Sequence, residues 1–117
     1  MKRKVYICAS SNGDVKKSIQ RAMLYTKFAL KSNVAPITPQ FFALSLDYDK
    51  KDERAIGQSA GINLLWYCDE MWIFGEEITN EMKAEINFCK NLNIKMRRIK
   101  AKEIRKKLGG KSYENTK

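Results

Sequence analysis

The sequence predicts one α/β domain with a parallel sheet of about four strands and helices on both faces. Two observations lead to this prediction. Short apolar runs with strand character alternate along the chain with longer segments in which apolar residues recur every three or four positions. The length of 117 residues and the apolar content of 44% suit a single hydrophobic core and leave no room for a second domain.

The first strand is expected at Lys4–Cys8, and a loop of small, turn-forming residues follows at positions 9–14. Asp14 is a suitable N-cap for a helix from Val15 to about Lys31. Apolar spacing predicts that the buried face of this helix contains Ile19, Ala22, Met23, Thr26, Ala29 and Leu30.

A second strand is expected at residues 33–37, where Asn33 ends the helix and Thr38-Pro39 ends the strand. The connection over residues 40–51 is too long and too aromatic for a simple turn. It is predicted to be a lid or binding loop, or else a hydrophobic flap packed over the core or into a subunit interface. The next helix is expected at residues 52–67, with its second half buried.

Residues 68–86 are the most informative segment. An apolar strand at residues 71–74 ends at Gly75, and a helix follows in which Glu85 falls among apolar positions. A fourth strand at residues 94–99 has no clean two-faced pattern, which indicates an edge strand. A short basic helix is expected at Ala101–Leu108, and residues 109–117 are expected to form a loose end.

Strands that alternate with helices predict right-handed β-α-β units and a strand order of 2-1-3-4. The winding direction of such a sheet changes between the first and third strands, where open α/β sheets bind ligands. The crevice is therefore expected between residues 9–14 and residues 75–80. Both loops lead into helix N-termini, which attract anions.

Charge and cysteine content limit the class of protein. The net charge of +10 is concentrated in residues 95–117, which hold ten basic and two acidic residues. This basic end is predicted to be solvated, with nucleic-acid binding as the alternative. The three cysteines lack C-x-x-C spacing and are expected to be buried and reduced.

Histidine is absent, which excludes Ser-His and Cys-His nucleophile pairs and the commonest zinc ligand. No metal site and no cofactor are predicted. The apolar run near the amino terminus is too short for a signal-peptide core, and no segment has the length of a membrane span. The sequence therefore predicts a soluble, cytoplasmic protein that does not enter a membrane.

Four motifs together suggest a family: Y-I-C-A-S-S-N-G-D from Tyr6, R-A-I-G from Arg54, C-D-E-M-W-I-F-G from Cys68 and I-T-N-E-M-K-A-E-I from Ile78. Over residues 3–99 the chain resembles small, uncharacterised phage and mobile-element proteins of the nucleoside 2-deoxyribosyltransferase-like superfamily. The resemblance implies a three-layer flavodoxin-like or Rossmann-like domain at residues 1–99, followed by a basic helix and tail at residues 100–117. It also implies a homodimer or larger homo-oligomer that binds nucleosides, nucleotides or related ligands.

The resemblance assigns roles to individual residues. Glu85 matches the glutamate that attacks the sugar C1′, and Tyr6 and Asp69 match an aromatic and an aspartate of the family pattern. The pattern is broken at Thr79, where the enzymes have a second acid, and at Gln40, where many relatives have histidine. Catalytic candidates are Glu85, Tyr6 and Asp69, and ligand-binding candidates are Ser10, Ser11, Asn12, Gly13, Gln40, Gly75, Glu76, Thr79, Asn80 and Met82.

Several alternatives stay open at this point. Glu85 has the alternative of a satisfying protein partner, and Asp69 that of an ordinary acid at a strand start, away from the crevice. Aromatic residues of the long connection, such as Tyr48, suit either base stacking or core packing. The expected function is binding of a nucleotide-like ligand at the carboxyl edge of the sheet, with N-glycosidic cleavage or transfer through Glu85. The alternatives are a non-catalytic phage protein that senses or sequesters a nucleotide signal, and a basic nucleic-acid-binding accessory protein.

Overall fold

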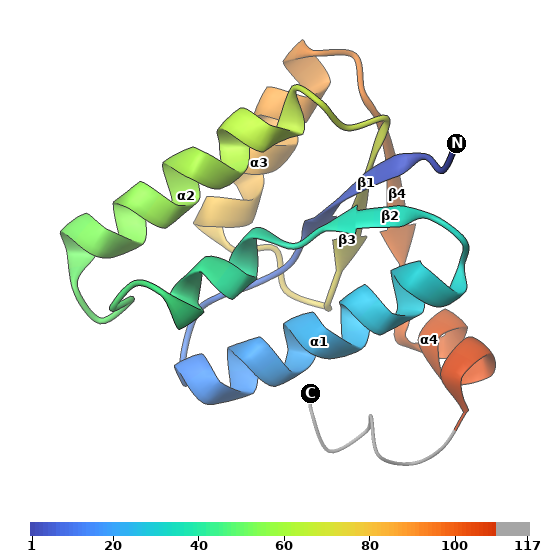
Figure 1. Cartoon of the computed structure of the whole chain (residues 1–117), viewed down its shortest axis with the longest axis horizontal. Coiled ribbons are helices and arrows are strands. Elements are labelled where there is room, and N and C mark those ends of the chain that lie inside the picture. Colours follow the sequence, from blue (N-terminus) through green and yellow to red (C-terminus); the bar gives the residue numbers. More distant parts are fainter. Residues whose placement is uncertain (110–117) are drawn as a thin grey trace.

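A four-stranded parallel sheet forms the centre of the molecule (Figure 1). The computed structural model describes residues 1–109 of the chain. The strands are β1 (Lys4–Cys8), β2 (Ala35–Ile37), β3 (Glu70–Phe74) and β4 (Lys95–Ile99). Their order is β2-β1-β3-β4, so the predicted α/β fold, strand order and edge position of β4 are confirmed.

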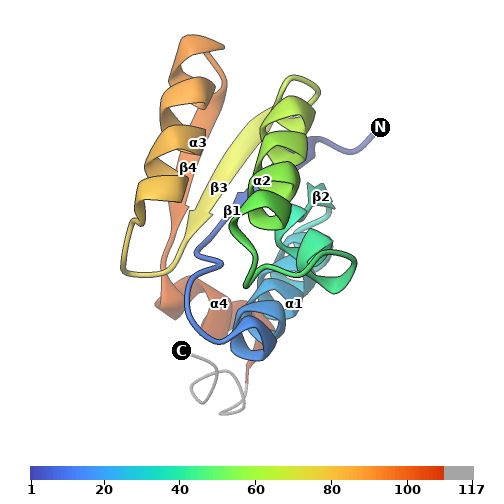
Figure 2. The same ribbon diagram turned by 90° about the vertical axis from the view of Figure 1, so that its left-hand side faces the viewer.

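Helices cover both faces of this sheet (Figures 1 and 2). The helices are α1 (Val15–Lys31), the 3-10 helix η1 (Pro39–Leu44), α2 (Lys51–Leu65), α3 (Asn80–Asn91) and α4 (Ala101–Leu108). α1 and α4 pack on one face, and α2 and α3 on the other. Asp14 caps α1 as predicted, since its side chain accepts a hydrogen bond from the backbone N–H of Lys16 at 2.8 Å.

Each face has its own hydrophobic core. Aromatic residues dominate the α1 side, where the rings of Tyr25 and Phe74 stack with centroids 4.4 Å apart. Smaller and sulfur-containing residues fill the α2–α3 side, including Met71, Met82 and Cys89. Every residue of β3 is buried, which explains why residues 71–74 form a continuous apolar run instead of an alternating one. Glu70, the first residue of the strand, is buried in an ion pair with Arg3.

The predicted buried faces of α1 and α2 are partly wrong. In α1 the core side is formed by Ser18, Ala22, Tyr25, Phe28 and Ala29, whereas Met23 and Leu30 are exposed. In α2 the buried residues are Gly57, Gly61 and Leu65. Trp66 and Tyr67, predicted to be buried, are 62% and 72% exposed. Glycine gives no apolar signal in a sequence, although here it marks the side of α2 that lies closest to its neighbours.

The carboxyl-terminal helix belongs to the core. Ile104 of α4 is 2% exposed and packs with the cluster on the α1 side of the sheet. The predicted loose end, apart from residue 109, lies outside the described residues. Within residues 1–109, every helix is too short or too polar to cross a membrane. All three cysteines are buried and free of disulfide bonds, as predicted.

Candidate functional site

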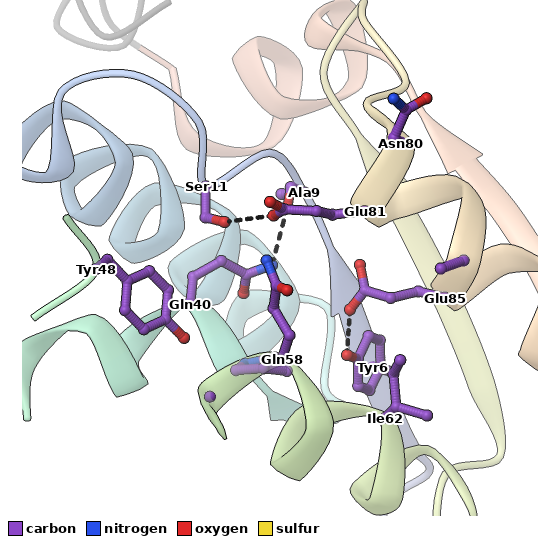
Figure 3. Close-up of a pocket in the computed structure, with 13 residues that line it drawn as sticks. Tyr6, Ala9, Ser11, Gln40, Tyr48, Gln58, Ile62, Asn80, Glu81 and Glu85 are labelled. Carbon is purple, nitrogen blue, oxygen red and sulfur yellow. Dashed lines mark hydrogen bonds between the residues drawn. The ribbon is translucent and has the colours of Figure 1, made fainter. Parts of the chain in front are cut away.

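A cavity of about 300 Å³ lies beyond the carboxyl end of β1, among the loop after that strand, η1, α2 and α3 (Figure 3). This volume is at the lower end of the range for small-molecule sites. The lining residues are Tyr6, Ala9, Ser11, Pro39, Gln40, Tyr48, Gly57, Gln58, Ile62, Asn80, Glu81, Ala84 and Glu85.

Two glycines of α2 allow the helix to approach the other walls. A Cβ on Gly57 would collide with the hydroxyl oxygen of Tyr48. A Cβ on Gly61 would lie 2.9 Å from Cβ of Pro39 and 3.1 Å from the hydroxyl oxygen of Tyr6. All of these contacts would be closer than ordinary van der Waals contacts, so the shape of the cavity depends on both positions having no side chain.

Glu85 places a carboxylate against the inner end of this cavity. The hydroxyl of Tyr6 donates a hydrogen bond to Oε2 of Glu85, and the thiol of Cys8 donates to Oε1 with a sulfur-to-oxygen distance of 3.6 Å. Burial raises the pKa of Glu85 to about 7, although the two hydrogen bonds favour the ionised form. Burial and the nearby Glu85 also raise the pKa of Tyr6 and of Cys8, so both remain protonated donors at neutral pH.

Arg54 joins three elements at the rim. Its Nη2 donates to the backbone oxygen of Ser11 at 3.1 Å, and its Nη1 lies 3.4 Å from Oε1 of Glu81. The hydroxyl of Ser11 donates to the other carboxylate oxygen of Glu81 at 3.2 Å (Figure 3). The guanidinium carbon lies 5.2 Å from the ring centroid of Tyr48, within the range of a cation–π contact. The rim therefore carries a paired positive and negative charge.

The structure brings five of the predicted site residues to this cavity: Tyr6, Ser11, Gln40, Asn80 and Glu85. A neighbouring hollow of about 420 Å³ is lined by Asn12, Thr79 and Asn80 together with Glu77, Ile78 and Glu81. The remaining predicted residues line neither space: Ser10, Gly13, Asp69, Gly75, Glu76 and Met82.

Four predicted residues that do not line the main cavity have structural roles of their own. Asp69 precedes β3 at the amino edge of the sheet, and its side chain accepts from the backbone N–H of Lys4 at 2.8 Å. Thr79 is the N-cap of α3, where its hydroxyl accepts from the backbone N–H of Met82 at 3.2 Å. Met82 is fully buried in the core below the cavity. Gly75, at φ 90°, accepts a hydrogen bond from Arg98 through its carbonyl.

Sequence reasoning missed most of the wall formed by α2 and the role of Arg54. The residues of the cavity and its rim without a site prediction are Pro39, Arg54, Gly57, Gln58, Ile62, Glu81 and Ala84. One usable signal was present, because glycines four positions apart in a helix indicate a close approach on that side.

The basic carboxyl-terminal segment has structural partners for several of its charges. Nη2 of Arg97 lies 2.5 Å from a carboxylate oxygen of Glu103, and its guanidinium lies over the ring of Trp72. Arg98 donates to the backbone oxygens of Gly75 and Glu76. Arginines that bind within the chain are less available to nucleic acid, and binding through this segment stays a prediction.

Comparison with known proteins places the chain in a family of undefined activity. No curated protein matches the sequence. One family model matches residues 3–99, which include every residue that lines the cavity. The chain therefore belongs to the family described as a domain of unknown function, DUF7768.

Proposed function

We propose that this protein binds a nucleoside or nucleotide-like ligand in the cavity at the carboxyl edge of the sheet, and cleaves or transfers its N-glycosidic bond through Glu85. The observation that supports this proposal most directly is the buried carboxylate of Glu85. It lines a cavity of ligand size, is oriented by Tyr6 and Cys8, and has a pKa near 7. The resemblance to nucleoside 2-deoxyribosyltransferase-like proteins suggests the reaction class.

In the proposed reaction, an ionised oxygen of Glu85 attacks the anomeric carbon of the sugar. The new carbon–oxygen bond replaces the bond to the base nitrogen, which keeps the bonding electrons and takes up a proton. Water, or a second base, then displaces Glu85 from the sugar. The hydroxyl of Tyr6 and the thiol of Cys8 orient the carboxylate.

The departing base needs a proton donor or a solvent path. Thr79 does not supply an acid, and its hydroxyl is engaged in capping α3. Glu81 stands one helical turn before Glu85 and lines the same cavity. We assign the missing second carboxyl group to Glu81, with Arg54 and Ser11 as its positioning partners.

The test is incubation of the purified protein with deoxynucleosides and their monophosphates, with chromatography for released base. Glu85→Gln is the matched control, because its amide oxygen still accepts from Tyr6 but is a poor nucleophile. Release by the native protein and none by the variant is the expected result. If no substrate in the panel yields free base, the enzymatic proposal is overturned.

A non-catalytic binder is the second candidate function. It is favoured by the contacts of Glu81, because its two carboxylate oxygens are already engaged by Arg54 and by the hydroxyl of Ser11. Such a protein would sense or sequester a nucleotide signal. Thermal shifts with nucleosides and nucleotides, followed by recovery of intact ligand, distinguish it from the enzyme.

The predicted homo-oligomer has a candidate surface on α2 and the two residues after it. Ile56, Trp66 and Tyr67 are all more than half exposed, which is unusual for large apolar residues on one helical segment. We extend the proposal to a second copy of the chain that covers these residues. Sedimentation of the purified protein provides the direct measurement.

A further inference from the structure

Two side-chain amides of the cavity have polar atoms without partners. Gln40 is 6% exposed, and its Oε1 is buried with no hydrogen-bond partner among residues 1–109. In the same part of the chain, Nε2 of Gln58 is also buried and unpartnered. Both residues line the cavity that contains Glu85 (Figure 3). Since buried polar atoms in native proteins are almost always paired, these two indicate ligand atoms that complete the hydrogen bonds.

The orientation of the Gln40 amide is fixed by the end of the sheet. Pairing between β1 and β2 ends at Ile37. In β2 every second backbone N–H faces β1, so the next donor would come from residue 39. This residue is Pro39, which has no N–H. The side chain of Gln40 takes over this task. Its Nε2 donates to the backbone oxygens of Ile7 at 3.1 Å and Ala9 at 3.2 Å.

A rotation of this amide would therefore leave two backbone carbonyls without a donor. Oε1 of Gln40 is consequently a fixed acceptor. The carboxylates of Glu81 and Glu85 line the same cavity and are acceptors when ionised. A wall rich in acceptors favours a ligand that brings hydrogen-bond donors.

We propose that the cavity selects a nucleobase with an exocyclic amino group, of the adenine or cytosine type. The amino group donates to Oε1 of Gln40, and the adjacent ring nitrogen accepts from Nε2 of Gln58. Hypoxanthine and uracil carry a carbonyl in place of the amino group and a ring N–H in place of the ring acceptor, so the same pose loses both hydrogen bonds. This inference rests on the nucleoside binding proposed above.

Two pairs of nucleosides with nearly identical shape test it. Dissociation constants of adenosine against inosine, and of cytidine against uridine, are measured by calorimetry with the native protein. The amino member of the tighter-binding pair is expected to bind about tenfold more tightly or better, since its keto partner leaves buried polar atoms unpaired. Equal or tighter binding of the keto member overturns the inference and leaves the proposed function standing. Absence of binding by all four nucleosides, by their deoxy forms and by the monophosphates of both overturns the inference and the proposed function together.

The variant Gln58→Glu separates amide recognition from general fit. It replaces the donor by an acceptor on α2, and leaves the hydrogen bonds of Gln40 to β1 intact. The ratio of the affinity for the amino nucleoside to that for its keto partner is expected to fall about tenfold, because a carboxylate at position 58 accepts a hydrogen bond from the ring N–H of a keto base. Asn63→Asp is the matched control, because it makes the same chemical change at an exposed position of α2 that does not line the cavity. An unchanged preference in Gln58→Glu overturns the inference.

Discussion

Replacing Glu85 by glutamine is expected to stabilise the protein at alkaline pH. The pKa of Glu85 is raised from 4.5 to about 7, mainly because burial disfavours the charged form. Between these two values the folded state holds the proton more tightly than the unfolded chain does. The free energy of unfolding therefore falls as the pH rises through this window, and stays level above the folded pKa.

The difference between the two pKa values corresponds to at most about 3 kcal/mol, at 1.36 kcal/mol for each pH unit. The glutamine side chain of the variant would not titrate, and its amide oxygen would still accept the hydrogen bond from Tyr6. The free energy of unfolding of Glu85→Gln minus that of the native protein should therefore be about 3 kcal/mol larger at pH 8 than at pH 4.

Urea unfolding of both proteins across this pH range measures the effect. Glu77→Gln serves as a control, because Glu77 is exposed to solvent and the chemical change is the same. A stability difference that is equal at pH 4 and pH 8 would show that Glu85 is not held in a buried, proton-favouring site. Base release, if it depends on ionised Glu85, should in turn increase as the pH rises through about 7.

Three further predictions concern the walls, the rim and the exposed face of α2. Gly61→Ala should destabilise the fold by roughly 1–3 kcal/mol in urea unfolding, because its Cβ would lie 2.9 Å from Cβ of Pro39; no loss of stability would contradict the close packing. Glu81→Gln should release Arg54 from its ion pair, which leaves the guanidinium available to a phosphate group. The ratio of the affinity for a monophosphate to that for its nucleoside should then rise by up to about fivefold in calorimetry. Tyr67→Lys should shift the protein toward the monomer in sedimentation experiments, since Tyr67 is exposed on the proposed contact face.

The sequence predicted the fold well where a local pattern matched the final environment. The buried central strands appeared as short apolar runs, and Asp14 appeared directly before a helical pattern that it caps. The prediction failed on α2, because the contact side of this helix is made by Gly57 and Gly61. Trp66 and Tyr67 supplied the apolar signal and proved to be exposed.

The candidate site was harder to predict because its contacts join distant parts of the chain. Arg54 reaches Ser11, 43 positions away, and Glu81, 27 positions away, and nothing local in the sequence links these residues. Thr79 shows the opposite situation. Its position at the start of a helix is a local signal for an N-cap, and the structure gives it that role.

The polar groups around the cavity connect ligand choice to the ionisation of Glu85. Donors from Tyr6, Cys8 and Gln40 are engaged with protein acceptors, while the carboxylate of Glu85 remains partly protonated near neutral pH. A ligand that donates a hydrogen bond to this carboxylate would stabilise its charged form and lower its pKa. By linkage, such a ligand must bind more tightly above pH 7 than below it. Binding of a donor-rich ligand would then itself increase the ionised, nucleophilic fraction of Glu85, whereas a ligand without donors would leave Glu85 partly protonated.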